Sequence, residues 1–423
     1  MTTKKSKNRA KVFLIILAVL VLAAGILTPL VMFPVGDMYD TLSPVRLSVP
    51  KGALPDDGFL KAYGKHIIDK DGNAVNLRGI NAGGYLIHEP WMSNIIFSDQ
   101  LSMQAALRHR FGNSDTARLF DAYQSSWWSE SDFDNIAAMG MNVIRLPFAY
   151  FNLAEPPYER YDFTLLENFV AECAKREIYV ILDLHGAYGS QNGEHHSGDA
   201  GSVELFGNEE NEAKTIDLWV QAAERFKDEP WVAGYDVLNE PEGETGLTNE
   251  VQWKFFKRAH DAIRAVDARH ILFLNACWEA WDMPDPKKYG YENVVYEYHA
   301  YQRLRPDSLA VHKLFDFYKM AAVEFLNYDV PLFMGEFSFF NNPDSWRYSL
   351  NLYNKKGYGW AMWTYKIIGH GGNSWGLYTC DPPKIDVETA GYDEILAAFS
   401  SLSTDSFEAN RWLIDIVSKY AVQ

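Results

Sequence analysis

The chain has 423 residues, 48% of them hydrophobic, a composition that excludes a disordered or low-complexity protein. Its 39 basic and 56 acidic residues give a net charge of −17, which argues against nucleic acid as the main partner. The three cysteines, Cys173, Cys277 and Cys380, have no metal-site spacing, so we expect them to be buried small apolar residues.

The N-terminus combines a basic tail with a long apolar segment. Residues 1–11 contain five basic residues and no acid, and Val12 to Phe33 contains only Thr28 as a polar residue. Twenty-two residues at ~1.5 Å each span a bilayer core of ~30 Å. We therefore predict a transmembrane signal anchor at 12–33, with the tail cytoplasmic and the rest of the chain extracellular. A signal peptide cleaved near Ala23-Ala24-Gly25, giving a secreted protein, is the alternative.

A short linker and a hairpin are expected before the main fold. Residues 34–55 contain Pro34, Pro44, Pro50 and Pro55 without helical periodicity, which is typical of a linker, so the catalytic domain is placed at 56–423. Gly64 to Leu77 is predicted to form a hairpin that turns at Lys70-Asp71-Gly72-Asn73, because Asp-Gly is a strong two-residue turn signal.

Eight short apolar runs rich in β-branched and aromatic residues alternate with amphipathic helical stretches in the rest of the chain. The predicted strands are 76–82, 142–147, 178–185, 232–239, 271–276, 294–299, 331–336 and 359–364, and the predicted helices include 132–139, 164–176, 213–226, 251–266 and 308–326. This alternation predicts an α/β fold of the (β/α)8 TIM-barrel type. A doubly wound open sheet is the alternative, but no glycine-rich dinucleotide turn follows the first strand.

Side chains that can catalyse a reaction or bind a substrate lie at the carboxyl ends of these runs, which is where a parallel barrel has its active site. The set comprises Arg145, His185, Asn239, Glu240, His299, Tyr301, Glu336 and Trp363. Glu240 and Glu336 each follow a mostly apolar run, so they should meet at one end of the barrel. Glycosidic bond cleavage needs two such carboxyl groups, one protonated to assist the leaving oxygen and one ionised.

The motifs Asn-Val-Ile-Arg-Leu-Pro, Asp-Leu-His-Gly, Leu-Asn-Glu-Pro, His-Ala-Tyr, Gly-Glu-Phe and the late Trp resemble glycoside hydrolase family 5, in the clan of retaining (β/α)8 glycosidases. The resemblance extends from Leu77 to about Tyr365. Gly79 to Leu86, Glu89-Pro90-Trp91 and Asp183 to Ala187 are most similar to the exo-β-1,3-glucanase group. Glu194-His195-His196 and the loop 369–377 depart from that group, so the resemblance leaves the exact sugar open.

The chemistry and the resemblance imply the same roles for the two glutamates. Glu240 is expected to be the acid/base, with a pKa raised by a partly apolar site and by the other carboxylate. Glu336 is expected to be the nucleophile, kept ionised by Arg145 and Tyr301. A retaining mechanism predicts carboxyl groups ~5–5.5 Å apart, against ~6.5–9.5 Å for inversion.

The remaining residues are expected to bind the sugar. Asn239 would hydrogen-bond the 2-hydroxyl, His185 and His299 would shape the site, Trp363 would stack beneath the ring, and Glu89 would bind a terminal sugar. No cofactor or metal is expected. A metal site at Glu194-His195-His196 is disfavoured, because adjacent side chains in an extended loop point apart.

The sequence thus predicts a membrane-anchored retaining β-glycosidase that acts on a β-linked glucose substrate, with an exo-β-1,3-glucanase mode as the first hypothesis. An endo-β-glucanase, or an enzyme acting on a glycolipid or small glycoside, is the alternative on the same fold. A catalytically silent carbohydrate-binding protein is the alternative of another class, and the intact carboxylate pair argues against it. The sequence does not indicate the oligomeric state.

Overall fold

The computed structural model describes residues 46–241, 249–276, 279–369 and 375–422. The predicted basic tail, the predicted membrane segment 12–33 and the first part of the predicted linker lie outside these residues, as do Cys277 and most of the loop 369–377. Among the residues that are described, no helix combines the length and the apolar character needed to cross a membrane. Of the cysteines, Cys173 is buried as predicted, and Cys380 is only partly buried.

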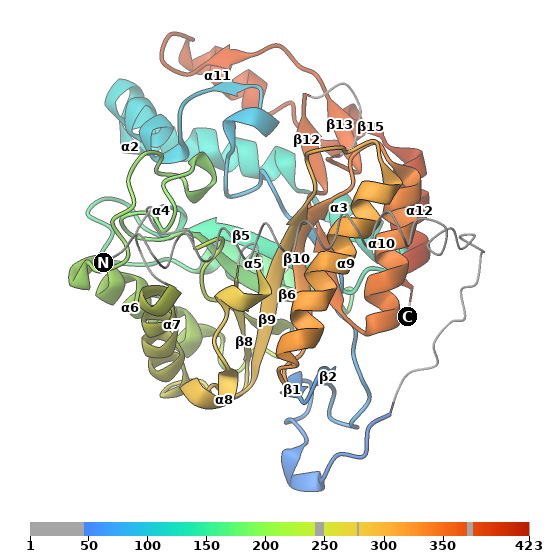
Figure 1. Ribbon diagram of the computed structural model, residues 1–423. Coiled ribbons are helices and arrows are strands. Elements are labelled where there is room, and N and C mark those ends of the chain that lie inside the picture. The colour runs from blue at the N-terminus through green and yellow to red at the C-terminus, as the bar shows by residue number, and fades with distance from the viewer. Residues whose placement is uncertain (1–45, 242–248, 277–278, 370–374, 423) are drawn as a thin grey trace, which may run out of the picture. The chain divides into compact units, whose positions relative to one another are not determined.

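Eight parallel strands close into a barrel in the order β10-β11-β3-β5-β6-β7-β8-β9, which confirms the predicted (β/α)8 architecture (Figure 1). They are β3 (Arg78–Asn81), β5 (Val143–Ala149), β6 (Tyr179–Gly186), β7 (Val232–Asp236), β8 (Ile271–Asn275), β9 (Val294–Tyr301), β10 (Leu332–Ser338) and β11 (Gly359–Met362). The expected end of the second strand at Arg145 is wrong. β5 continues to Ala149, so Arg145 projects from the middle of a strand.

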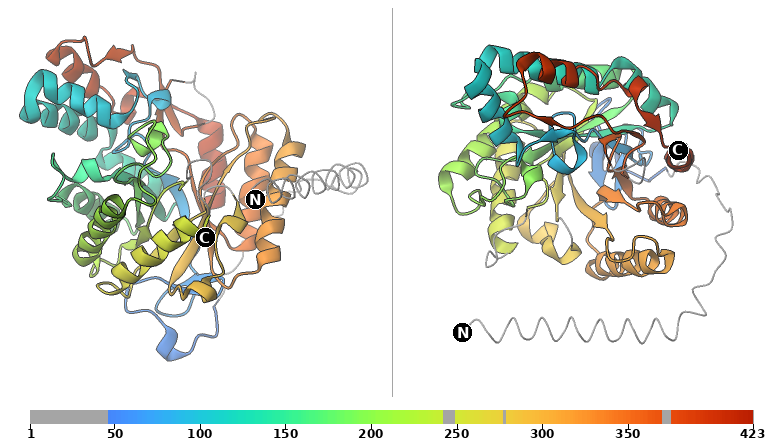
Figure 2. Two further views of the ribbon diagram at one scale, coloured as in Figure 1. Left: turned by 60° about the vertical axis from the view of Figure 1, so that its left-hand side comes forward. Right: turned by 90° about the horizontal axis from the view of Figure 1, so that it is seen from above.

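Helices follow the strands and surround the barrel, as the two further views show (Figure 2). Five agree with the predicted ranges to within four residues at either end: α3 (Glu130–Ala138), α5 (Thr164–Ala174), α6 (Glu209–Phe226), α7 (Asn249–Arg264) and α9 (Leu309–Leu326). The others are α2 (Gln100–Trp127), α4 (Tyr150–Leu153), α8 (Pro286–Tyr289), α10 (Pro343–Lys356), α11 (Tyr392–Phe399) and α12 (Arg411–Ala421). The long helix α2 was not predicted, because Gly112, with φ of 78°, interrupts its helical pattern with a turn signal.

The predicted hairpin is present, but its main turn was misplaced. β1 (Lys61–Tyr63) pairs antiparallel with β2 (His66–Ile68), so the chain reverses at Gly64-Lys65. A second reversal at Asp69–Asn73 is closed by a single bridge between Ile68 and Ala74. The Asp69 carboxylate accepts hydrogen bonds from the backbone of this turn, so the Asp-Gly signal marked a real turn with little strand after it.

Short strands, 3-10 helices and loops complete the chain around the barrel. β4 (Ile95–Ile96) pairs with β14 (Ile385–Asp386), and β12 (Lys366–Ile368), β13 (Tyr378–Cys380) and β15 (Glu408–Ala409) form a three-stranded sheet. The 3-10 helices are η1 (Lys51–Ala53), η2 (Pro90–Met92), η3 (His195–Ser197), η4 (Ala280–Asp282) and η6 (Thr404–Ser406). Two of them, η2 and η3, border the cavity described below.

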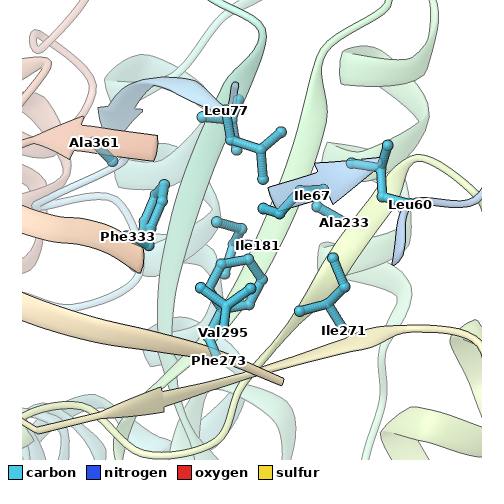
Figure 3. Close-up of a cluster of buried hydrophobic side chains, with 11 residues drawn as sticks. Leu60, Ile67, Leu77, Ile181, Ala233, Ile271, Phe273, Val295, Phe333 and Ala361 are labelled. Carbon is cyan, nitrogen blue, oxygen red and sulfur yellow. The ribbon is translucent and has the colours of Figure 1, made fainter. Parts of the chain in front are cut away.

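An apolar cluster fills the amino-terminal end of the barrel (Figure 3). Its members come from the first residues of the strands and from the β1–β2 hairpin: Leu60, Ile67, Leu77, Val143, Ile181, Ala233, Ile271, Phe273, Val295, Phe333 and Ala361. All are at least 95% buried, and the largest residual exposures are 5% at Ile67 and 3% at Leu60. The hairpin therefore closes this end, and the opposite end is left for polar side chains.

Candidate active site

Arg145 occupies the centre of the barrel and is fully buried. Its guanidinium lies 2.7–3.2 Å from one oxygen of each of four carboxyl groups, those of Asp183, Asp236, Glu297 and Glu336. It also donates to the amide oxygens of Asn81 and Asn239, at 3.1 and 2.8 Å. A planar guanidinium with five donors suits such a site, because it bonds several acceptors in fixed directions.

Two of these four carboxyl groups hold protons more tightly than usual. Burial and the neighbouring acid Glu297 raise the pKa of Asp183 to about 7, although Arg145 opposes the rise. The pKa of Asp236 is raised well above its ordinary value, first by burial and then by Glu297. By contrast, Arg145 and His299 outweigh burial and lower the pKa of Glu297. The raised pKa values of the two aspartates thus limit the negative charge of the cluster near neutral pH.

Glu336, on β10, is held from two sides. Arg145 Nη1 donates to Oε1 at 2.8 Å, and Tyr301 Oη, from the end of β9, donates to Oε2 at 3.0 Å. These are the two donors expected from the sequence. Gly335 precedes it, and only glycine fits there because a Cβ would lie 1.6 Å from Glu297 Oε1. The carboxylate is therefore fixed by charge and by close backbone packing.

Glu240 lies just beyond β7 in a sharp turn, with φ of 39° in the left-handed region that side chains rarely adopt. One of its oxygens lies 2.6 Å from His299 Nδ1, and the other lies 3.1 Å from His196 Nε2. An oxygen of Glu240 and an oxygen of Glu336 lie within 4.8 Å of each other. The two glutamates thus meet at the carboxyl end of the barrel, as the sequence predicted.

The expected raised pKa of Glu240 is wrong. Burial raises it, but hydrogen bonds from His196 and His299 outweigh burial and lower the pKa well below its ordinary value. The two imidazoles show the reciprocal effect. Burial lowers their pKa values, but the surrounding carboxylates raise that of His299 to about 10 and that of His196 to about 9. At neutral pH His196 and His299 are therefore protonated, and Glu240 is ionised.

His185 and Asn239 support the two glutamates from below. His185 Nδ1 donates to Asp183 at 2.7 Å, and its Nε2 accepts from the Asn239 amide at 3.2 Å. Burial lowers the pKa of His185 well below its ordinary value, so the ring is neutral in this tautomer. Gln191 donates to the backbone oxygens of both residues, which locks the loop after β6 against the end of β7.

A cavity of about 720 Å³ opens above the glutamates. Of the predicted site residues, it is lined by Glu89, His185, Glu240, Tyr301, Glu336 and Trp363, and its other walls come from Trp91, Asn192, Glu194, His195, His196, Arg303 and Trp375. Arg145, Asn239 and His299 do not line it and lie buried beneath. Large aromatic surfaces beside convergent polar groups suit a sugar ring, which has apolar CH faces and hydroxyl edges.

Glu89 is buried at the side of this cavity. Its carboxylate accepts from Trp91 Nε1 at 2.5 Å and lies 3.5 Å from His195 Nδ1. Burial raises its pKa to about 7, against the lowering influence of His196 and Trp91. Trp91 packs against Trp375 with ring centroids 4.8 Å apart, so acid and aromatic surface stand together at this wall.

Comparison with known proteins finds matches over most of the chain. The family model Cellulase (glycosyl hydrolase family 5) matches residues 109–368. A beta-xylosidase of Phanerodontia chrysosporium is 30% identical over 348 residues, which cover 74% of this chain and 72% of that protein. The chain belongs to glycosyl hydrolase family 5.

Other family 5 relatives are named for a different sugar. A probable glucan 1,3-beta-glucosidase A of Aspergillus fumigatus is 28% identical over 273 residues, covering 62% of this chain and 65% of that protein. Glucan 1,3-beta-glucosidase 2 of Wickerhamomyces anomalus is 29% identical over 256 residues, covering 55% of this chain and 58% of that protein. The matches span slightly less than two thirds of these glucosidases.

Solved structures confirm the fold of this family 5 chain. The structure titled AoRut has a TM-score of 0.58 at 18% identity and covers 71% of this chain and 94% of its own. An endogalactoceramidase has a TM-score of 0.55 at 20% identity, with 74% and 75% covered. At such low identity the likeness shows the barrel fold alone.

Sequence reasoning missed part of this family 5 site. The missed residues include three acids that each occur alone within an apolar strand: Asp183, Asp236 and Glu297. A single acid in such a strand indicates a buried cationic partner, and this signal could have been used. His195 and His196 were expected to point apart. Both instead line the cavity, because residues 195–197 form a 3-10 turn rather than an extended loop.

Among the described residues, two groups of three side chains bring ligand-type atoms within 4.8 Å: Glu89 with His195 and His196, and Glu240 with His299 and Glu336. In the second group the carboxylate oxygens already receive hydrogen bonds from Arg145, Tyr301 and the imidazoles. In the first group Glu89 accepts from Trp91 Nε1, and His196 Nε2 pairs with Glu240. We therefore assign no metal to either.

Proposed function

We propose that this protein is a retaining β-glycosidase that releases terminal glucose from β-1,3-glucans. The observation that carries the proposal is the pair Glu240 and Glu336, with carboxyl oxygens within 4.8 Å at the floor of an aromatic-walled cavity. Carboxyl oxygens this close are compatible with the ~5–5.5 Å between the carboxyl groups of retaining enzymes, and they favour retention over the ~6.5–9.5 Å of inverting enzymes.

In the first half of the reaction, Glu336 attacks the anomeric carbon while Glu240 protonates the departing oxygen. Arg145 and Tyr301 hold the nucleophile by its two oxygens and position it for attack. In the second half, Glu240 takes a proton from water, and the water oxygen displaces Glu336 from the sugar. His185, Asn239 and His299 fix these groups from below, and Trp363 presents its ring beside the glutamates. A contact of Asn239 with the 2-hydroxyl stays a prediction.

The exo mode and the glucose specificity rest on two supports. Glu89 and Trp91 form a polar and aromatic wall beside the glutamates, where the non-reducing end of a chain would be recognised. Several relatives are named glucan 1,3-beta-glucosidases. A β-xyloside is the second candidate substrate, because a relative with 30% identity is named a beta-xylosidase.

A product time course tests this proposal. The full chain in detergent is incubated with β-1,3-gluco-oligosaccharides labelled at the reducing end, alongside aryl β-glucoside and aryl β-xyloside. We expect stepwise release of single glucose units and faster cleavage of the aryl glucoside. Release of internal fragments would overturn the exo mode, and preference for the xyloside would move the specificity to xylose. Failure to cleave any β-glycoside, glycolipids included, would favour a silent binding protein.

We also propose that residues 12–33 anchor the enzyme in a membrane, with the catalytic domain outside the cell. The support is the length of the apolar segment and the basic tail before it. Membrane extraction at alkaline pH should leave the full chain with the lipid. Recovery of a mature chain beginning near Ile26 would instead show a cleaved signal peptide and a secreted enzyme.

A further inference from the structure

His196 contacts the proposed acid/base directly, and nothing in the two-carboxylate chemistry requires it there. Its Nε2 lies 3.1 Å from Glu240 Oε2, while His299 serves the other oxygen of the same carboxylate. The charged groups that face the His196 ring are Glu240, Glu89 and Glu336, and its neighbours His185 and His195 have ring centroids 5.9 and 5.8 Å away. His196 is thus surrounded mainly by acids.

Asn192 provides a second hydrogen-bond partner for the same His196 nitrogen. The Asn192 Oδ1 accepts from the Glu194 backbone at 3.0 Å, and its Nδ2 donates to the Glu240 carbonyl at 3.1 Å, so the amide orientation is fixed. The same Nδ2 lies 2.8 Å from His196 Nε2. An amide N–H only donates, so this contact is a hydrogen bond when His196 Nε2 carries a lone pair.

The contact with Glu240 completes this arrangement. When His196 is protonated, Nε2 donates to the Glu240 carboxylate. When it is neutral, the single lone pair on Nε2 accepts one hydrogen bond, either from Asn192 or from a protonated Glu240. A proton can therefore pass along the 3.1 Å contact, and Nε2 has a hydrogen-bond partner in both end states: Glu240 when it is protonated, and Asn192 or Glu240 when it is neutral.

We propose that His196 stores the proton that Glu240 delivers to the leaving group, an inference that rests on the proposed role of Glu240 as the acid. The proton moves from His196 Nε2 to Glu240 Oε2, which leaves a neutral imidazole and a carboxylic acid. Glu240 then passes the proton to the glycosidic oxygen as the bond from that oxygen to the anomeric carbon breaks and Glu336 bonds to the carbon. When water later displaces Glu336, Glu240 takes the water proton and returns it to His196.

The charge states of Glu240 and His196 explain why a stored proton is needed. Because Glu240 is ionised at rest, it cannot act as an acid until a proton reaches it. His196 holds its proton up to about pH 9, because the hydrogen bond to Glu240 and the charges of Glu240, Glu89 and Glu336 outweigh burial. The pair keeps one shared proton across the neutral range, which extends the working range of the acid toward alkaline pH.

Replacement His196→Gln tests the proposal, because glutamine keeps hydrogen-bonding capacity but carries no titratable proton. On gluco-oligosaccharides we expect the alkaline limb of the kcat/KM profile to move to lower pH, with a loss of about tenfold or more at pH 8. At pH 5 activity should be retained, because loss of the neighbouring cation also raises the pKa of Glu240. Aryl glycosides with good leaving groups should lose little activity at either pH.

His260→Gln is the matched control, since His260 pairs with the Asp261 carboxylate at 2.9 Å on α7 and lines no part of the cavity. It should leave the pH profile unchanged. A loss in His196→Gln that is equal at pH 5 and pH 8 would indicate a merely structural role and overturn the proposal. An unchanged alkaline limb would overturn it as well.

A measurement without turnover separates this inference from the proposed function. The His196 imidazole is titrated by nitrogen NMR in the wild type and in Glu240→Gln, with His196→Gln identifying its signal. We expect a midpoint near 9 in the wild type that falls toward the ordinary value of 6.5 once the Glu240 charge is gone. A midpoint that Glu240→Gln leaves in place would refute the shared proton, even if the enzyme cleaved a different glycoside from the one proposed.

Discussion

The two ends of the barrel are built from the same eight strands and have opposite chemistry. At the amino-terminal end the inward side chains are apolar and close-packed, from Leu77 to Ala361 (Figure 3). A few residues further along the same strands, Arg145 lies among four carboxyl groups. Strand β10 shows both, because Phe333 belongs to the apolar cluster and Glu336 to the charged one.

Because of this difference, we expect the apolar end to determine the stability of the fold and the charged end to determine catalysis. Apolar burial stabilises the fold by about 25 cal/mol per Å² removed from water. Buried charges must instead recover a desolvation cost of several kcal/mol each through their partners, so they contribute little net stability. We therefore expect substitutions at the two ends of β10 to affect different quantities.

The largest effect should come from Glu336→Ala at the charged end. Loss of the nucleophile should lower kcat by about 10⁴-fold or more. The free energy of unfolding should change by less than about 2 kcal/mol, because Arg145 keeps three other carboxyl partners. Steady-state kinetics and urea unfolding measure the two quantities, with Glu324→Ala on the exposed face of α9 as the control. Turnover near the wild-type level would refute the nucleophile assignment.

Phe333→Ala at the apolar end should have the reverse effect. The ring packs against Phe273 with centroids 5.4 Å apart and is fully buried, so its removal should cost about 3–5 kcal/mol of unfolding free energy. The kcat of the folded enzyme should stay within about threefold, since Phe333 touches none of the catalytic groups. Phe317→Ala, 59% exposed on α9, is the control and should change stability by less than about 0.5 kcal/mol. A large fall in kcat for Phe333→Ala would show that the two ends are coupled.

The smallest effect concerns a buried carboxyl group outside the barrel. Asp316, between α9 and α10, accepts from Ser349 and Tyr353, and burial raises its pKa to about 7. A folded-state pKa above the unfolded one stabilises the protein fully below about pH 4, and this stabilisation is lost as pH rises through 7.

Asp316→Asn should therefore gain stability relative to the wild type between pH 5 and pH 8, by roughly 1–3 kcal/mol. Urea unfolding at the two pH values measures the difference, and Asp344→Asn at the exposed start of α10 is the control. A constant difference between variant and wild type would mean that Asp316 is ionised throughout this pH range.

The fold and the two glutamates could be predicted because their signals are local. Glu240 and Glu336 directly follow apolar runs, and strand ends of a parallel barrel meet at one face. Asp183, Asp236 and Glu297 were missed because a single acid inside an apolar strand does not reveal which partner it faces. The positions of His195 and His196 depended on a 3-10 turn in a loop, where the sequence pattern carries little information.

The sequence by itself determined the alternation of barrel strands and helices and the residue types available for catalysis. Hydrophobic periodicity is a property of neighbours in the chain, so one sequence suffices to find it. Only the tertiary structure decided that Arg145 bonds to four acids, that Glu240 is ionised between two imidazoles, and that His196 reaches it. Charge states depend on distances across strands and on exclusion of water, and these exist only when the barrel has closed.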